Sequence, residues 1–388
     1  MKKRASRLIS ILLAFALVAM TALVFTSCGS DSVKIGVLVA DGSGAEAMAF
    51  RSYYENYIAE PDDVEFVYSS QLDDAADEQA AIETFAAENC KAIISFSSYD
   101  RPGQIEACAE YKMYYAVATG MLSEEDFETY KSNEYFLGQI GPDTLVEYNV
   151  GLAIGTYYKN QGVKNVALYV GFPDPAHVYR AAGILTGLGL SHAGFAGPVS
   201  GMDIGGMIYA MDEGTLNLNN IIAGESGVTV TQVLSGAGFG GPLDAQVTSL
   251  IAGEHPDVVI GVGMVSVFFA SQLDTAGIPY ADVDAFTADN KAHFENGSMG
   301  YLAGKYGSSV GPVFALVYNA INGNVIRDNG NAVSLSQNYL VATSVDEFGT
   351  AYAKESGNTP IFSKDVLDTV IGKDITFSSF KAFVAAER

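Results

Sequence analysis

The stretch from Val33 to Ile58, VKIGVLVADGSGAEAMAFRSYYENYI, contains the two kinds of element from which the fold is built. Its first seven residues form a short apolar run with little interruption, which predicts a buried strand. From Phe50 to Ile58 the large apolar residues recur every three to four positions, which predicts a helix. The globular part of the chain therefore begins with a strand followed by a helix.

This pairing repeats over the next hundred residues. Further strands are predicted at 64–68, 92–96 and 114–118, with a helix around 82–86 between the first two of these. Strands that alternate with helices are typical of a parallel sheet with right-handed crossover connections.

A second series starts after Gly141-Pro142 and has the same rhythm. Helices are predicted at 146–157, 179–188 and 247–251, and strands at 166–170, 228–233, 258–262 and 284–287. Two α/β units of similar construction therefore stand in tandem. Residues 194–227 are rich in glycine and have no clear period, which indicates an insertion in the second unit.

The charge balance excludes whole classes of partner. The chain has 388 residues, with 21 basic and 45 acidic side chains and a net charge of −24. Four bases precede Asp31, the first acid, so the chain from Cys28 onward has 17 bases against 45 acids. Such an acidic surface repels nucleic-acid phosphates and anionic lipids, so we expect neither as a direct partner.

The N-terminus has the pattern of an export signal. Basic residues at 2–7 precede an apolar run at 8–25 and the small residues Thr26 and Ser27. Cys28 after these small residues resembles a bacterial lipobox, in which the cysteine becomes lipidated. This resemblance implies a signal peptide at 1–27, lipidation of Cys28 and a tether at 28–32. A transmembrane signal anchor and an incidental cysteine are the alternatives.

Two more cysteines, Cys90 and Cys108, precede a predicted strand and end the following helix. Because a strand and its crossover helix run antiparallel, both cysteines are expected at one edge of the sheet. A disulfide is therefore possible, and two buried thiols are the alternative.

Motifs for catalysis are incomplete. Residues 42–47 match G-x-G-x-x-A of dinucleotide-binding folds, but Ser69-Ser70-Gln71 stands where a ribose-binding acid is required. Residues 307–311 match G-x-S-x-G, yet every histidine precedes Ser309. The histidines also lack zinc-binding spacing. We therefore expect no enzyme, metal or cofactor.

Three motifs add a family resemblance. Arg180-Ala-Ala-Gly183-Ile184 after a strand, His255-Pro256-Asp257-Val258 before a strand and the helix end at 319–323 resemble the type I periplasmic solute-binding proteins, especially the ribose-type sugar binders. The resemblance implies two Rossmann-like α/β lobes with parallel sheets, joined by a hinge of three crossings. The implied first lobe comprises 33–140 and 308–330, and the implied second lobe comprises 141–307 and 331–388.

The resemblance places a ligand at the carboxyl ends of strands from both lobes, as expected for open α/β sheets. Arg180 could hold two ligand oxygens with its planar guanidinium, or pair with Asp174 instead. Asp289 aligns with a family carboxylate, and Tyr99 and Phe172 could stack on a ligand or simply pack. The expected ligand-binding residues are Asp41, Ser43, Ser70, Gln71, Ser98, Tyr99, Thr119, Phe172, Arg180 and Asp289.

One departure affects the expected ligand. Where sugar binders of this type have Asn-Asp, this chain has Met264-Val265-Ser266. Loss of these groups would leave sugar hydroxyls without partners, so the expected solute is less hydroxylated, or the insertion at 194–227 supplies contacts.

The sequence therefore predicts a lipid-anchored extracytoplasmic receptor that delivers a small polar, carbohydrate-like ligand to the permease subunits of an ABC importer. A nucleoside-binding or sensory lipoprotein of the same fold is one alternative. An exported enzyme is the other.

Overall fold

The computed structural model describes residues 32–171, 175–192, 221–222, 224, 226–236, 241–253, 255–356 and 360–386. Cys28, Phe172, Asp174 and most of the predicted insertion lie outside these ranges. From Lys34 onward the chain forms one compact unit. Within it, two six-stranded sheets define two lobes.

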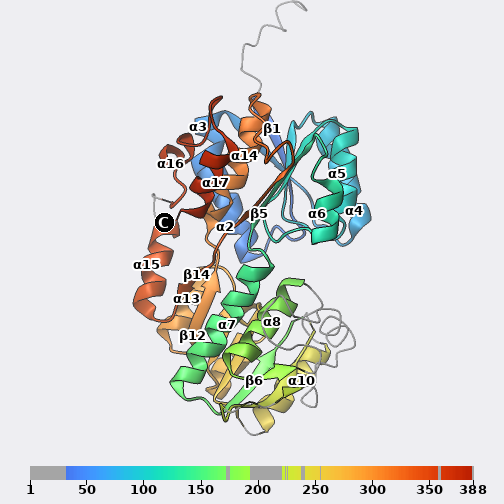
Figure 1. Cartoon of the computed structure of the whole chain (residues 1–388). Coiled ribbons are helices and arrows are strands. Elements are labelled where there is room, and N and C mark those ends of the chain that lie inside the picture. Colours follow the sequence, from blue (N-terminus) through green and yellow to red (C-terminus); the bar gives the residue numbers. More distant parts are fainter. Residues whose placement is uncertain are drawn as a thin grey trace, which may run out of the picture. The chain divides into compact units, whose positions relative to one another are not determined.

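The first lobe is built on a sheet with strand order β13-β5-β4-β3-β1-β2. Register between β1 and β3, β3 and β4, β4 and β5, and β5 and β13 is parallel. The strands are β1 (Val33–Leu38), β2 (Val64–Tyr68), β3 (Ala92–Ser95), β4 (Tyr114–Val117), β5 (Phe136–Gly141) and β13 (Val333–Ser336). In Figure 1, α4, α5 and α6 cover one face of this sheet, and α2 and α14 cover the other. The helices are α2 (Ala45–Tyr53), the π-helical η1 (Tyr54–Ala59), α3 (Glu60–Asp62), α4 (Ala75–Ala87), α5 (Arg101–Glu110), α6 (Glu124–Tyr130), the short 3₁₀ helix η4 (Gly307–Val310) and α14 (Gly311–Ile321).

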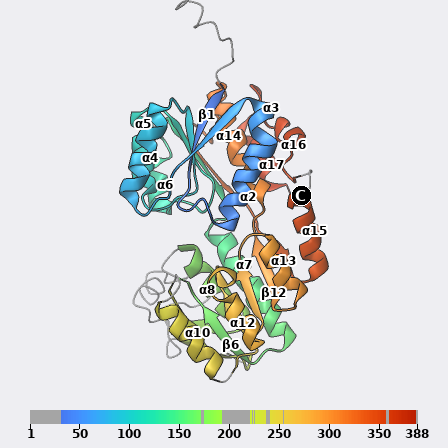
Figure 2. The same ribbon diagram turned by 180° about the vertical axis from the view of Figure 1, so that it is seen from behind.

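The second lobe has the strand order β14-β12-β11-β10-β6-β9, and β14 runs antiparallel to β12. The strands are β6 (Asn165–Tyr169), β9 (Thr229–Leu234), β10 (Val258–Gly261), β11 (Tyr280–Val283), β12 (Met299–Gly304) and β14 (Leu340–Ala342), with a separate antiparallel pair of β7 (Ser191–His192) and β8 (Ile221–Ile222). The helices are α7 (Thr144–Gln161), α8 (Pro175–Gly187), α10 (Pro242–Ala252), α11 (Val265–Phe268), α12 (Ala270–Ala276), α13 (Ala288–Glu295) and α15 (Val345–Ser356). Figure 2 shows this lobe from behind.

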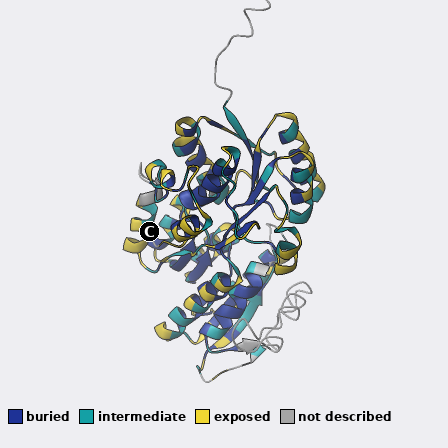
Figure 3. Ribbon diagram, turned by 45° about the horizontal axis from the view of Figure 1, so that its top comes forward, coloured by how far each residue is buried: buried dark blue, intermediate teal, exposed yellow. Residues whose placement is uncertain are grey.

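The predicted fold class is confirmed, and the apolar runs explain it. Along β6, Val166 and Leu168 pack into a core on one face of the sheet, whereas Ala167 and Tyr169 pack into a core on the other. A strand buried on both faces needs continuous apolar sequence, which is the signal that predicted it. Figure 3 shows the same distribution, with buried residues in the strands and exposed residues on the outer helix faces.

One strand was predicted in the wrong place. The structure has β11 at Tyr280–Val283, and residues 284–287 follow it as a connection instead of forming a strand. The strand contains Asp282, whose side chain is fully buried. An acid inside a buried strand runs against the usual preference for apolar residues there, so the apolar pattern did not mark 280–283 as a strand.

The helices α7 and α8 pack through glycines. A Cβ atom at Gly151 of α7 would lie 2.1 Å from the Arg180 carbonyl oxygen, and one at Gly183 of α8 would lie 2.1 Å from that of Tyr148. These distances leave no room for any side chain, so the two backbones touch. The close approach brings the first turn of α7 next to Arg180 of α8, as the hydrogen bonds below show.

The chain crosses between the sheets after β5, after β12 and after β13, as the family resemblance implies. The tail differs from the expected boundaries, which placed all of 331–388 in the second lobe. Strand β13 pairs with β5 in the first sheet, whereas β14 and α15 belong to the second lobe. The chain then returns to the first lobe, where α16 (Lys364–Asp368) contacts α14 and α17 (Phe377–Ala385) contacts β13.

This return is fixed by specific bonds. The Tyr53 hydroxyl donates to the Phe362 carbonyl at 2.5 Å, and the Asn319 side-chain amide donates to the Val370 carbonyl at 2.7 Å. Lys364 pairs with the buried Asp62 at 3.1 Å. The described chain thus makes a fourth passage between the lobes, beyond the three expected.

Candidate functional site

A buried polar network joins α7, α8 and the third crossing. The Arg180 Nε donates to Glu147 Oε2 at 2.6 Å, and its Nη1 donates to the Val262 carbonyl at 2.7 Å. Its Nη2 donates to the Tyr339 hydroxyl at 2.7 Å, and that hydroxyl donates to Glu147 Oε1 at 2.9 Å. The side chains of Arg180 and Glu147 are 11% and 5% exposed.

This network changes the interpretation of Arg180. The predicted alternative to ligand binding was an ion pair with Asp174, which lies outside the described residues. The structure provides a different carboxylate, Glu147, one helix away. The guanidinium therefore holds the end of β10 to the third crossing, a positioning role that the spacing in the sequence did not indicate.

A second arginine organises the strand ends of the first lobe. Arg101, the first residue of α5, donates from Nη2 to the Thr119 carbonyl at 2.7 Å and from Nη1 to the Met121 carbonyl at 2.8 Å. These bonds connect the loop after β3 to the loop after β4. Predicted residue Thr119 therefore lies beside Arg101, which the sequence reasoning did not select.

The backbone of the loop that carries Ser98 and Tyr99 is held by a buried carboxylate of α4. Glu78 is fully buried, and its carboxylate accepts the backbone N–H groups of Tyr99 at 3.1 Å and Asp100 at 2.9 Å. The Asp100 side chain in turn caps α5 at the Gly103 N–H. Tyr99 is 52% exposed, so it faces solvent from a loop whose backbone is bonded to Glu78.

Lys305 is a buried cation at the start of the second crossing. It follows β12 directly, and its side chain is 11% exposed. Its ion-pair partner is Glu46 in the first turn of α2, with Oε1 at 4.0 Å from Nζ. Burial lowers the pKa of the Lys305 ammonium, the carboxylates of Glu46 and Glu147 raise it, and the charges of Arg180 and Arg101 lower it.

The remaining predicted residues of the first lobe are exposed. The Asp41 carboxylate accepts the Ser43 N–H at 2.8 Å and its hydroxyl at 2.6 Å, and these bonds lower the pKa of Asp41. Gln71 donates to Asp73 at 3.0 Å. Ser70 is exposed, whereas its neighbour Ser69 ties β2 to β1 by exchanging hydrogen bonds with the backbone of Val39.

Asp289 lines a hollow of about 560 Å³ that both lobes form. The α2–η1 segment contributes Ser52 and Tyr57 among others, the start of α13 contributes Asp289, and the second and fourth passages contribute Gly307 and Pro360. This volume is in the range of small-molecule sites. Among the described residues that line this hollow, none belongs to the polar network of Arg180.

The residues that replace Asn-Asp turn their polar groups inward. Ser266 donates from its backbone N–H and its hydroxyl to Asp282 Oδ2, both at 2.8 Å, and the hydroxyl also contacts Asp284. The Asn290 side chain donates to Asp284 at 3.2 Å. Burial, and then the charge of Asp284, raise the pKa of Asp282 to about 7.

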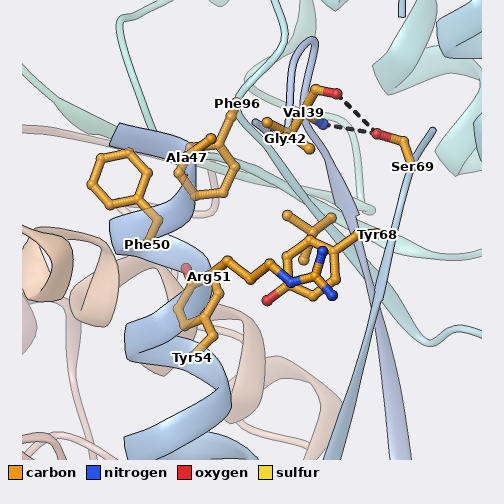
Figure 4. A pocket seen from close by; sticks show the side chains of 10 residues that line it. Val39, Gly42, Ala47, Phe50, Arg51, Tyr54, Tyr68, Ser69 and Phe96 are labelled. Carbon is orange, nitrogen blue, oxygen red and sulfur yellow. Dashed lines mark hydrogen bonds between the residues drawn. The ribbon is translucent and has the colours of Figure 1, made fainter. Parts of the chain in front are cut away.

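A smaller cavity of about 40 Å³ lies beneath α2, beside β1 and β2 (Figure 4). The Arg51 guanidinium stacks over the Tyr68 ring, 4.4 Å from its centroid. Within the described residues the buried Tyr68 hydroxyl has no hydrogen-bond partner. The cavity has room for a few water molecules and is too small for a sugar.

Two sites of chemistry, a nucleophilic Ser309 and a metal-binding cluster, are not formed by the described residues. Ser309 is 5% exposed in η4, and its hydroxyl has no hydrogen-bond partner there, so no described base activates it. No described group of three histidine, cysteine or acidic residues could hold a metal ion. In the same part of the chain, no helix combines the length and apolar character needed to cross a membrane.

Cys90 and Cys108 are free, buried thiols, so the structure has two buried thiols in place of a disulfide. Burial raises the pKa of the Cys90 thiol to about 11 and that of Cys108 further. Such thiols are poor nucleophiles at neutral pH.

Two residues of the network, Glu147 and Tyr339, and the nearby cation Lys305 were missed from sequence. Lys305 had a signal, because a cation directly after the apolar run 301–304 marks a strand end. Glu147 and Tyr339 had none, since their partner Arg180 is 33 and 159 residues away.

No protein-family model matches this sequence, and no curated protein matches it. Solved structures do match. An ABC transporter solute-binding protein from Bacillus halodurans with bound myo-inositol is 16% identical, with a TM-score of 0.57, covering 84% of this chain and 100% of that one. The periplasmic binding protein of an arabinose ABC transporter from Shewanella sp. ANA-3, bound to arabinofuranose, is 15% identical, with a TM-score of 0.55 and coverages of 83% and 95%.

A periplasmic solute-binding protein of an ABC transporter from Actinobacillus succinogenes, with bound D-allose, is 12% identical, with a TM-score of 0.59 and coverages of 82% and 99%. These proteins share the two-lobed arrangement of this chain at low sequence identity. The chain therefore has the fold of the type I periplasmic solute-binding proteins.

Proposed function

We propose that the chain is an extracytoplasmic receptor that binds a small carbohydrate-like solute and delivers it to an ABC importer. The observation that carries this proposal is the fold, because solved structures of the same fold hold myo-inositol, arabinofuranose and allose. The pre-organised strand-end loops of this chain support it, since a receptor needs fixed polar groups around its ligand.

In this proposal, strand-end residues of both lobes contact the ligand. Ser98 and Tyr99 contribute from the loop that Glu78 holds, and Thr119 contributes from the loop whose carbonyl groups accept hydrogen bonds from Arg101. Arg180 positions the second lobe's edge through Val262 and Tyr339. The other contacts come from Asp41, Ser43, Ser70, Gln71, Phe172 and Asp289. The lobes close by rotating about the crossings, and no covalent bond changes.

The membrane anchor is part of the proposal and rests on the sequence alone. Lipidation at Cys28 would hold the receptor at the membrane near its permease subunits. Replacement Cys28→Ser should release the chain from the membrane fraction, because the lipid is lost. A chain that stays in that fraction after the replacement contradicts lipidation at Cys28.

Mass spectrometry of ligand retained by the purified full chain tests the central claim. In parallel, a thermal-shift screen with myo-inositol, D-allose, L-arabinose and nucleosides should give the largest rise in melting temperature with a sugar or polyol. Asp289→Asn should weaken binding, and Asp374→Asn, an exposed acid on the tail, should not. Stabilisation by nucleosides alone would favour the nucleoside receptor, and no stabilisation by any solute contradicts the receptor function.

A further inference from the structure

The side chain of Lys305 is 11% exposed, and its ammonium group has no close acceptor among the described residues. Its distance of 4.0 Å to Glu46 Oε1 exceeds the 2.7–3.2 Å of a hydrogen bond. Among the described residues no acceptor of a Lys305 Nζ hydrogen bond is present. A lysine side chain that is largely withdrawn from water normally has an acceptor for its ammonium group, because the loss of hydration is costly.

The charges around Lys305 favour an anion. Two further cations, Arg101 and Arg180, act electrostatically on Lys305, as do the carboxylates of Glu46 and Glu147. Glu147 is engaged by Arg180 at 2.6 Å. The Glu46 side chain is 46% exposed, so water screens its attraction for Lys305. The local excess of positive charge remains in a chain whose net charge is strongly negative.

The strand ends nearby offer few acceptors for ligand hydroxyls. Asp282, Asp284 and Ser266 are bonded to one another, and Asn290 donates to Asp284 and to the Ala285 carbonyl. A neutral sugar is held largely by carboxylates and amides that accept its hydroxyl hydrogens. Here those groups face inward, whereas the Lys305 donor has no acceptor among them.

We propose that the ligand carries an anionic group, a carboxylate or a phosphate, and that Lys305 binds it. This inference rests on the proposed function and names its substrate class: an acidic sugar or polyol. An oxygen anion at hydrogen-bond distance from Nζ supplies the missing acceptor, and such a charge-assisted bond is about twice as strong as a neutral one.

Matched pairs of probes test the charge directly. Isothermal titration of the full chain compares D-glucuronate with D-glucose and D-galacturonate with D-galactose, and glucose 6-phosphate distinguishes phosphate from carboxylate. We expect the preferred acid to bind at least about tenfold more tightly than its neutral partner, as a charge-assisted bond predicts. Its affinity should fall as salt is raised, whereas that of the neutral sugar should not.

Variants assign the effect to Lys305. Lys305→Gln should lower the affinity for the acid more than that for the neutral sugar and so remove the preference, and Lys305→Arg should restore part of the preference. Lys291→Gln is the matched control, because Lys291 is an exposed lysine of the same lobe, paired with Glu295 at 3.0 Å. If Lys305→Gln does not fold, Lys305→Met keeps the aliphatic stem without the buried charge.

The outcomes separate the two claims. Neutral sugars that bind as tightly as their acids overturn the anionic ligand and leave the receptor function intact. An acid preference that survives in Lys305→Gln and Lys305→Met overturns the role of Lys305. Equal loss of acid and neutral binding in these variants also overturns it. If no sugar or acid binds, the receptor function fails, and the inference fails with it.

Discussion

The first helix of each lobe is held in a different way. In the second lobe, this helix is α7, and its backbone touches that of α8 at Gly151 and Gly183. In the first lobe, α2 and η1 pack through rings, with Tyr54 stacked on Phe66 at 4.6 Å and Phe50 on Phe96 at 5.1 Å. The ring packing leaves the 40 Å³ cavity beside α2, whereas the glycine contact leaves no space.

This difference shows how each lobe sets the position of its polar groups. The glycine contact fixes Arg180 relative to Glu147 by the distance between two backbones, which no rotamer change can alter. Ring packing fixes a helix through side chains that can adjust. We therefore expect the second lobe to lose stability when atoms are added at the helix contact, and the first lobe to lose stability when ring atoms are removed.

Tyr54→Ala should have the largest effect and tests the first lobe. The buried ring and its hydroxyl bond to the Val310 carbonyl at 3.1 Å are both lost, so we expect the free energy of unfolding to fall by about 4 kcal/mol. Urea denaturation measures it. Tyr54→Phe should lose only the hydrogen bond, about 1 kcal/mol. Equal effects of the two variants would contradict packing by the ring.

Gly183→Ala tests the helix contact of the second lobe. The added Cβ meets the Tyr148 carbonyl, so the helices must separate, and we expect a loss of about 3 kcal/mol in the same assay. Gly349→Ala in α15 is the control, since nothing lies within 4 Å of its Cβ position. That variant should gain stability through helix propensity. A neutral Gly183→Ala would show that the two backbones do not touch.

Glu147→Gln asks whether Arg180 belongs to the structure or only to binding. The change leaves the Arg180 charge buried without its carboxylate, so we expect a loss of about 2 kcal/mol. The double variant Glu147→Gln with Arg180→Met should lose less than the sum of the single variants, which a double-mutant cycle measures. If Glu147→Gln keeps full stability but loses ligand binding, Arg180 contacts the ligand and does not stabilise the fold.

The stability of the second lobe should depend on pH through Asp282. Its pKa is raised in the folded state, so the folded chain holds more protons than the unfolded chain between about pH 4 and pH 7. Stability contributed by the protonated form is therefore present at low pH and is lost as pH rises through this window, by about 1 kcal/mol or more.

Asp282→Asn should flatten this profile in a series of denaturation curves. The control is Asp257→Asn. The Asp257 carboxylate accepts backbone N–H groups of Lys164 and Asn165, which lower its pKa. Its contribution is present at neutral pH and is lost only as pH falls through the lowered pKa. An unchanged pH profile in Asp282→Asn would show that its carboxyl does not titrate in that range.

The smallest effect is expected from a reductant. Cys90 and Cys108 are free thiols, so dithiothreitol should leave the melting temperature unchanged. A fall in melting temperature would mean that a disulfide also stabilises the first lobe, in addition to its ring packing.

Local sequence patterns predicted the strands well, because burial on both faces demands continuous apolar runs such as 166–170. They failed at β11, where buried Asp282 interrupts the run. They also could not assign β13, because a four-residue strand carries no information about which sheet it joins. The Arg180–Glu147 pair depends on how closely two helices approach, which the glycines permit but their sequence spacing does not specify.

The position of β13 and α17 near the end of the chain has a consequence for the order of folding. The first lobe begins at residue 33, yet its sheet is completed only by residues 333–336, and α17 reaches β13 only at 377–385. The second sheet has all its strands but the edge strand β14 by Gly304. An emerging chain can therefore assemble most of the lobe that starts later while the lobe that starts first stays unfinished. We therefore expect the first lobe, which contains the beginning of the described chain, to be the last to complete its folding.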